Sequence, residues 1–175
     1  MKVKWGVIGS AGIARRRTIP EGILPADNAA LVAVYDTNQT ANDEIARQFD
    51  VIGCKTIEEL LEADINAVYI ATPTWLHRQY VEKAAAAGKH VLCEKPLGMS
   101  AEECQGMIDT CEQCGVKLGT GFMMRFQAQH QAALRLIREG GIGVPVFARA
   151  QLSCWYPPIH DAWRQSPKLG GGGSL

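Results

Sequence analysis

Three short stretches of this sequence carry residue types that could bind a nucleotide or move a proton. The first is the glycine-rich turn Gly9-Ser10-Ala11-Gly12-Ile13-Ala14, the second is Asp36, and the third is Glu94-Lys95-Pro96. Each follows an apolar run of strand character. Free N–H groups at a strand–helix turn attract phosphate, a carboxylate accepts from hydroxyl groups, and a lysine can polarise a substrate oxygen.

The glycine-rich turn matches the dinucleotide fingerprint G-x-G-x-x-G/A at its first and last positions. Gly9 opens it, and Ala14 closes it with a small residue that lets the helix approach the strand. Ala11 stands at the middle position, so we expect its methyl group to tighten the approach of a pyrophosphate and Gly12 to restore the room. A plain tight turn is the alternative. The strand before it and the helix after it favour a nucleotide site.

Asp36 follows the turn at about the spacing of 20 residues that the fingerprint expects. A carboxylate there accepts hydrogen bonds from the adenosine ribose and repels a 2′-phosphate. Thr37 and the residue after it bring no arginine to pair with that phosphate, so the sequence favours NAD over NADP. Arg15-Arg16-Arg17 could hold extra negative charge, but we prefer a solvated helix face with general attraction for phosphate.

The elements that must position these residues alternate between strand and helix. Strands are expected at 2–8, 31–35, 51–54, 67–71, 90–93, 116–120 and 145–153. Helices are expected at 13–19, 38–49, from 57 after the capping box 56–59, at 76–87, from 101 after the capping box 100–103 to 114, and at 127–139. Pro20 restricts the first helix. This alternation, with strands apolar on both faces, predicts a doubly wound α/β fold with a parallel sheet.

Composition limits the classes of protein. With 18 basic and 18 acidic residues the net charge is zero, which argues against a nucleic-acid binder, and 47% hydrophobic residues argue against disorder. No stretch reaches the roughly 20 apolar residues of a membrane span, and the N-terminus has no secretory signal. Six cysteines lie mostly in periodic apolar segments, so we expect reduced thiols in a cytoplasmic protein.

Cys111-Glu112-Gln113-Cys114 is a C-x-x-C that could suggest redox or metal chemistry. However, Cys104, Met107, Ile108 and Cys111 fall on one helical face. No second pair with zinc-site spacing follows, so we interpret the segment as a core stripe and expect no metal site.

The chain resembles the Gfo/Idh/MocA oxidoreductases, which include glucose–fructose oxidoreductase and inositol dehydrogenase. The resemblance covers essentially the whole chain. It is carried by GVIGSAGIA at 6–14, VAVYD at 32–36, ATPTWLH at 71–77, AAAAGKHVLCEKPLGMS at 84–100, GFMMRF at 121–126, AWR at 162–164 and GGGGSL at 170–175. The EKP element is much more specific than the glycine loop.

The resemblance implies roles for individual residues. Lys95 is the expected catalytic lysine, near the reacting oxygen and the nicotinamide ribose, and Glu94 helps to hold the nicotinamide side. Pro96 is expected to follow a cis peptide bond. The remaining expected cofactor contacts are Thr72, Pro73, Thr74 and His77 along the adenosine and pyrophosphate half, Arg125 near the nicotinamide ribose and substrate pocket, and Trp163 with Arg164 from the second domain.

Elementary chemistry agrees with a catalytic Lys95. A lysine beside a bound cofactor can donate to a developing alkoxide, and partial burial would lower its pKa and suit it to proton exchange. For His77, an ordinary histidine at a helix N-terminus is an equal alternative to a ligand contact.

The resemblance also implies a domain organisation. Residues 1–122 are the expected Rossmann-type NAD(P)-binding domain, and 123–175 begin a C-terminal domain for substrate binding and oligomerisation. Family members continue for well over a hundred further residues, where a histidine and an aspartate join the lysine. We therefore expect this chain to be a fragment, a truncated product or an incompletely recorded chain, and to be inactive alone. GGGGS at 170–174 resembles an engineered linker, but its place fits the glycine run of the family.

The expected activity of the parent protein is NAD(P)-dependent hydride transfer to or from a sugar, cyclitol or related polyol, in a homo-oligomer that binds neither nucleic acid nor membrane. Two alternatives stay open. One is an NAD-dependent glycosidase that oxidises its substrate transiently, and the other is a nucleotide-sensing regulator without catalysis.

Overall fold

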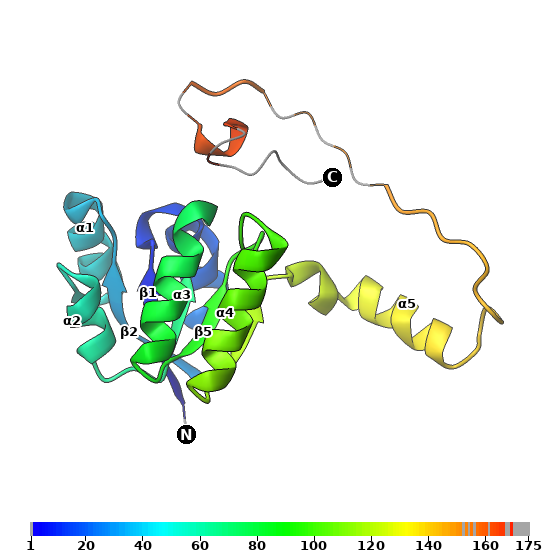
Figure 1. Cartoon of the computed structure of the whole chain (residues 1–175), viewed down its shortest axis with the longest axis horizontal. Helices are drawn as coiled ribbons and strands as arrows, with labels where there is room; N and C mark the ends of the chain where they lie inside the picture. Colours follow the sequence, from blue (N-terminus) through cyan, green and yellow to red (C-terminus); the bar gives the residue numbers. More distant parts are fainter. Residues whose placement is uncertain are drawn as a thin grey trace. The chain divides into compact units, whose positions relative to one another are not determined.

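The computed structural model describes residues 2–151, 153, 155, 157–160, 162–166 and 169. The chain divides into two compact units. The first comprises Met1–Gly121 with Trp163–Leu175, and the second comprises Phe122–Ala162. The first unit contains the sheet and the helices that cover it (Figure 1).

Six strands form one parallel sheet in the order β3-β2-β1-β4-β5-β6. Their bounds are β1 Val3–Ile8, β2 Ala29–Tyr35, β3 Ile52–Gly53, β4 Ala67–Ile70, β5 His90–Cys93 and β6 Leu118–Thr120. The chain builds outward from β1 in one direction and then from β4 in the other. This order is that of a doubly wound dinucleotide-binding sheet, and it confirms the predicted fold class.

Helices cover both faces of this sheet. They are η1 Ser10–Ile23, α1 Gln39–Phe49, α2 Ile57–Glu62, η2 Thr74–Leu76, α3 His77–Ala86 and α4 Ala101–Gln113. Figure 1 shows α3 and α4 side by side across one face. Alternate residues of β1, β2, β4 and β5 supply two apolar clusters, one under η1 and α1 and the other under α2, α3 and α4. The strands are therefore apolar on both sides, as their sequences predicted.

The first helix differs from its prediction. It does not end before Pro20 but continues to Ile23 as a π-helix. The N–H of Leu24 donates to the carbonyl of Ile19 at 3.0 Å, the five-residue spacing of that helix type. The wider turn accommodates a proline, which has no N–H to donate and whose ring crowds the preceding turn of an α-helix.

Both predicted capping boxes are formed. The hydroxyls of Thr56 and Ser100 accept from the N–H groups of Glu59 and Glu103 at the starts of α2 and α4. The two glutamate side chains reach back to the N–H of the residue before each cap, at 2.7 and 2.9 Å. Each helix start is thus fixed by a reciprocal pair of bonds.

The second unit carries η3 Met123–Phe126 and α5 Ala128–Arg138. The strand predicted at 145–153 is wrong for the residues described there, which are exposed and form no strand. A strand needs a partner to pair its backbone groups, and no described segment pairs with this one. The glycine run at 170–174 lies outside the described residues. None of the described helices is long and apolar enough to span a bilayer.

A close approach between α1 and the sheet edge gives a test of this packing. A methyl group at Gly53 would lie 2.9 Å from the Cβ of Ala46, which cannot move without the α1 backbone. We expect Gly53→Ala to lower the free energy of unfolding by about 1–3 kcal/mol, measured by urea denaturation. Gly106→Ala is the control, because its methyl would meet only the Arg78 guanidinium at an ordinary 3.7 Å. That change should be neutral or add up to about 1 kcal/mol. Equal losses in both variants would contradict the argument.

Candidate functional site

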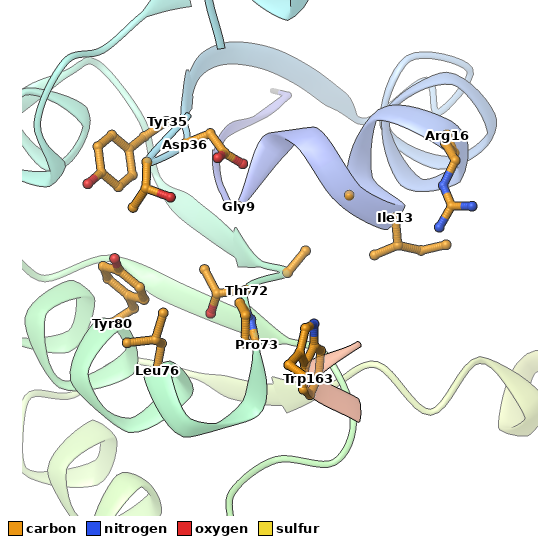
Figure 2. Close-up of a pocket in the computed structure, with 13 residues that line it drawn as sticks. Gly9, Ile13, Arg16, Tyr35, Asp36, Thr72, Pro73, Leu76, Tyr80 and Trp163 are labelled. Carbon is orange, nitrogen blue, oxygen red and sulfur yellow. The ribbon is translucent and has the colours of Figure 1, made fainter. Parts of the chain in front are cut away.

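A cleft opens at the carboxyl ends of β1, β2 and β4, within the first unit (Figure 2). Ligands of doubly wound folds bind at this position, where the strand order reverses. The residues that line the cleft are Gly9, Gly12, Ile13, Arg16, Tyr35, Asp36, Thr37, Ala71, Thr72, Pro73, Leu76, Tyr80 and Trp163. Eight of these thirteen residues were predicted from the sequence as cofactor contacts, namely Gly9, Gly12, Ile13, Asp36, Thr37, Thr72, Pro73 and Trp163.

Gly9 forms the floor of the cleft. Its φ of +83° lies in the left-handed region, and a methyl group there would lie 2.8 Å from backbone atoms of Ala71 and Thr72. Only glycine allows the turn after β1 to reverse this sharply while it touches the turn after β4. The first position of the fingerprint therefore requires glycine, because two backbone segments are in contact there.

The rest of the turn differs from the prediction at Ala11 and agrees with it at Gly12. Ala11 does not line the cleft, and its N–H donates to Oδ2 of Asp36 at 2.9 Å. Gly12 does line it, with open space where a side chain would stand. The open backbone needed for phosphate approach is thus at Gly12, one residue later than in the usual fingerprint.

Asp36 is fixed by two backbone donors. Its second oxygen, Oδ1, accepts from the N–H of Asn38 at 2.9 Å. Each carboxylate oxygen can accept a further hydrogen bond, so the group remains able to bind ribose hydroxyls. The bond to Ala11 also ties the end of β2 to the turn after β1.

Thr72 provides the clearest sign that the cleft binds a polar ligand. Its hydroxyl oxygen is buried and has no hydrogen-bond partner among the described residues. Such a group costs free energy unless something pairs with it. In Figure 2 its side chain lies across the cleft from Gly9 and Asp36. A phosphate or ribose oxygen is the kind of partner that this position can take, so a dinucleotide fits the residues present.

The three consecutive arginines have different surroundings. Arg15 bonds with Glu44 at 3.2 Å, and Arg17 pairs with Glu21 at 2.7 Å, both on the exposed helix surface. Arg16 forms no ion pair or hydrogen bond with a described residue, and it lines the cleft. Figure 2 shows it at the far end from Tyr35 and Asp36. The preferred interpretation of a solvated face therefore holds for two of the three.

Three residues predicted as cofactor contacts have side chains that are buried in the interior of the protein. Ser10 is fully buried and donates to Oδ1 of Asn42 at 3.1 Å, while Ala14 is fully buried on the core face of η1. Thr74 is 2% exposed. None of them lines the cleft. Ala14 still fulfils the packing role expected of a small residue, but direct contact with a ligand does not follow from these positions.

His77 is also inside, at 1% exposure. Its Nδ1 lies 3.0 Å from the carbonyl oxygen of Pro96 and 3.1 Å from that of Leu97, and its Nε2 lies 3.0 Å from that of Thr72. Both ring nitrogens thus face backbone oxygens. Of the two alternatives for this residue, the structure favours the ordinary histidine at a helix N-terminus, because His77 begins α3 and does not line the cleft. It makes His77 a bridge between the turns after β4 and β5.

The EKP element follows β5. Glu94 is half-buried, and its Oε2 accepts from the N–H of Lys95 at 3.1 Å. The Lys95–Pro96 peptide bond is cis, as the resemblance implied. Lys95 is exposed, and the partial burial expected of a lysine beside a bound cofactor stays a prediction. None of the three residues lines the cleft described above.

The three remaining predicted contacts, Trp163, Arg125 and Arg164, do not all lie in the same compact unit. Trp163 belongs to the first unit and packs edge-to-face on Trp75, with ring centroids 5.4 Å apart. Figure 2 shows Trp163 next to Pro73 at the cleft. Arg125 lies in the second unit, in η3. Arg164 follows Trp163 in η4 Trp163–Gln165, and its side chain lies outside the described part.

Sequence reasoning missed Tyr35, Leu76 and Tyr80, which line the Asp36 end of the cleft. Leu76 and Tyr80 are four residues apart and so share a helical face, a signal the sequence did contain. Burial, and then the neighbouring Tyr35, raise the pKa of Tyr80. Its phenol therefore stays protonated and available as a hydrogen-bond donor.

The cysteine-rich helix α4 offers no second site. Met107 and Cys111 are buried in its core face, Cys104 is half-buried and Cys114 is exposed. Burial raises the pKa of Cys111, which disfavours its thiolate. Among the described residues, no cluster of three His, Cys, Asp or Glu side chains is placed to hold a metal ion.

A parallel sheet with this strand order, a glycine turn at its first strand and an acidic residue ending its second define a nucleotide-binding protein of the Rossmann class. Comparison with known families agrees. The family GFO_IDH_MocA, described as an oxidoreductase family with an NAD-binding Rossmann fold, matches residues 3–122. The chain belongs to this family of oxidoreductases.

Individual relatives support the assignment. The chain is 38% identical to 1,5-anhydro-D-fructose reductase from Ensifer adhaerens, over 97% of this chain and 51% of that protein. It is 34% identical to 2,7-anhydro-N-acetylneuraminate hydratase from Escherichia coli, over 97% of this chain and 45% of that protein. The chain thus spans about half the length of the curated relatives it matches.

A solved structure extends the likeness. The Y186F mutant of KijD10, a 3-ketoreductase from Actinomadura kijaniata in complex with TDP-benzene and NADP, superimposes with a TM-score of 0.81. The two chains are 27% identical, and the match covers 98% of this chain and 53% of that one.

The bridge made by His77 can be tested without any ligand. His77→Ala removes a buried ring whose nitrogens contact three backbone carbonyl oxygens, and it opens a cavity, so we expect a loss of about 2–4 kcal/mol in the free energy of unfolding. His90→Ala is the control, because His90 is exposed and accepts one bond from the N–H of Lys117. It should cost less than about 1 kcal/mol. Similar losses in urea denaturation would argue against the bridge.

Proposed function

We propose that this protein binds a nicotinamide dinucleotide in the cleft and transfers hydride between it and a sugar, cyclitol or related polyol. The observation that carries the proposal is the unpaired, buried hydroxyl of Thr72, a residue that lines the cleft at the point where the sheet reverses its strand order. A polar ligand of the dinucleotide type satisfies that hydroxyl, and membership of the oxidoreductase family supports the choice.

Different residues of the cleft are proposed to bind different parts of the dinucleotide. Gly12 offers open backbone for a pyrophosphate at the start of η1, and Arg16 offers a guanidinium for the same charge. Asp36 binds ribose hydroxyls at the end where Tyr35 and Tyr80 form the wall. When bound, the nicotinamide ring supplies the acceptor or donor of hydride.

Lys95 is the proposed catalytic residue. It follows β5 at the same edge of the sheet as the cleft, and its ammonium has no partner among the described residues. It would polarise a carbonyl oxygen or donate a proton to a developing alkoxide. Glu94 and Pro96 hold the backbone on either side of it, and Arg125 and Arg164 are proposed to complete the cofactor and substrate contacts.

NAD is the proposed cofactor. The family is described as NAD-binding, whereas its member KijD10 was solved with NADP, so the family does not decide between them. The carboxylate of Asp36 supports NAD, because a 2′-phosphate beside it would bring two negative charges together.

The proposed domain division is 1–122 for the cofactor and 123–175 for the beginning of a substrate and oligomerisation domain. A change of compact unit at Gly121 and Phe122 supports the boundary, although Trp163 and the residues after it group with the first unit. A homo-oligomer remains part of the proposal.

A second candidate is a reaction in which the substrate is oxidised only transiently and the cofactor shows no net turnover. The relative from Escherichia coli supports it, because a hydratase adds or removes water without net oxidation of its substrate. Accumulation of reduced cofactor with a polyol substrate favours the first candidate. Conversion of the substrate at a constant cofactor redox state favours the second.

The role of Asp36 gives the test of the cofactor. Isothermal titration of the protein with NAD and NADP should show tighter binding of NAD. Asp36→Ser should lower the preference for NAD about tenfold, because the repulsion of the 2′-phosphate is removed.

Asp43→Asn removes a charge on α1 away from the cleft and should leave the preference unchanged. If the unaltered protein bound neither dinucleotide, the proposed function would be wrong. If it bound NADP more tightly, only the cofactor assignment would fail.

The arginine triplet gives a second test. Arg16→Gln should weaken NAD and NADP by the same factor, about three- to tenfold, and reduce the salt dependence of binding, because Arg16 lies away from Asp36 and pairs with a phosphate common to both. Arg15→Gln and Arg17→Gln lose only surface ion pairs and should change the affinity less than twofold. A selective loss of NADP affinity in Arg16→Gln would instead assign this arginine to the 2′-phosphate.

A further inference from the structure

A line of hydrogen bonds crosses the first unit beneath the glycine turn. The hydroxyl of Thr18, in η1, donates to the phenol oxygen of Tyr69 at 3.0 Å. The Tyr69 hydroxyl donates to Oε1 of Glu94 at 2.8 Å. The other oxygen of Glu94 accepts from the N–H of Lys95. The line therefore begins on the helix after the glycine turn and ends in the EKP element.

Tyr69 is the central member of this line. It lies in β4 with 2% of its surface exposed, and its ring packs in the apolar cluster under η1. Burial is the main cause that raises its pKa well above the usual range, and Glu94 adds to this. The raised pKa favours the protonated phenol, which donates to Glu94.

The carboxylate of Glu94 has little freedom. Tyr69 holds one oxygen and the backbone of Lys95 holds the other. A methyl group at Gly121, just after β6, would lie 3.2 Å from Oε1 of Glu94. The backbone that follows β6 therefore also limits the space around this carboxylate. Tyr69 in β4, the residue after β6 and the backbone next to Glu94 therefore determine where this carboxylate points.

The position of Glu94 in the sheet indicates which half of a dinucleotide would lie near it. In doubly wound sheets the two mononucleotide halves lie on either side of the point where the strand order reverses. Asp36 ends β2, on one side of β1, and Glu94 follows β5, on the other side of β4. If the adenosine half lies at Asp36, the nicotinamide half lies toward Glu94.

We propose that Tyr69 is a positioning residue, which fixes the Glu94 carboxylate for recognition of the nicotinamide half of the cofactor. This inference rests on the proposed function. Tyr69 itself lies under the turn and does not line the cleft, so it acts through Glu94.

The test compares two ligands that differ only in the nicotinamide half. Isothermal titration with NAD and with ADP-ribose measures the contribution of nicotinamide to binding. Tyr69→Phe keeps the ring and removes the hydroxyl, and it should weaken NAD about tenfold while it changes ADP-ribose less than twofold. Tyr80→Phe is the matched control at the Asp36 end and should weaken both ligands by the same factor.

A double-mutant cycle shows whether Tyr69 acts through Glu94. In a Glu94→Ala background, Tyr69→Phe should cause no further loss of NAD affinity. If the two losses added, or if Tyr69→Phe weakened NAD and ADP-ribose equally, the positioning role would be overturned. If the unaltered protein bound neither ligand, the proposed function itself would fail, so the two failures are distinguishable.

Loss of a buried hydroxyl can also destabilise the fold, so a second variant is needed. Thr18→Val removes the donor that holds the phenol from the opposite side and leaves the bond to Glu94 possible. It should produce the same selective loss for NAD, but a smaller one of about two- to threefold. No selectivity in either variant contradicts the inference.

Discussion

The contact between two backbones at Gly9 is the constraint on which the site depends. The turn after β1 lies directly against Ala71 and Thr72, the turn after β4, and no side chain fits between them. Because β1 and β4 are neighbours in the sheet while their following helices cover opposite faces, the two turns diverge above this contact. The cleft is the space that this divergence leaves, and Thr72, whose buried hydroxyl has no partner among the described residues, lines it.

Hydrogen bonding around this contact follows a simple division. Polar groups that determine the shape of the site are paired inside the protein, such as Ser10 with Asn42 and the N–H of Ala11 with Asp36. Two residues that line the cleft, Thr72 and Arg16, have polar groups with no partner among the described residues. Buried polar groups cost free energy when they are unpaired, so these two positions point to a ligand, whereas Asp36 both fixes the turn and keeps lone pairs for binding.

The sequence predicted the elements better than the orientation of their side chains. Runs of apolar residues located the six strands of the sheet, and local signals such as Thr56 with Glu59 located helix starts, because both depend on residues close in sequence. Local rules failed at Pro20, where the chain takes a π-helix, and at 145–153, where strand character alone does not supply a pairing partner. A resemblance can transfer a residue type, but whether it faces a cleft or the core depends on tertiary packing. His77 and Ser10 matched the motifs and turned inward.

Two polar bridges explain how an exposed lysine can be held in a defined place. On the η1 face of the sheet, Tyr69 connects the helix after the glycine turn to Glu94. On the α3 face, His77 connects the turn at Thr72 to the backbone at Pro96 and Leu97. Lys95 lies between the two attachment points, so the backbone on each side of it is tied to a turn that borders the cleft. A rigid backbone limits the entropy lost when a side chain meets a reacting group, and such positioning contributes substantially to catalysis. The reactivity proposed for Lys95 thus depends less on burial of its ammonium group than on how closely these two bridges fix its backbone.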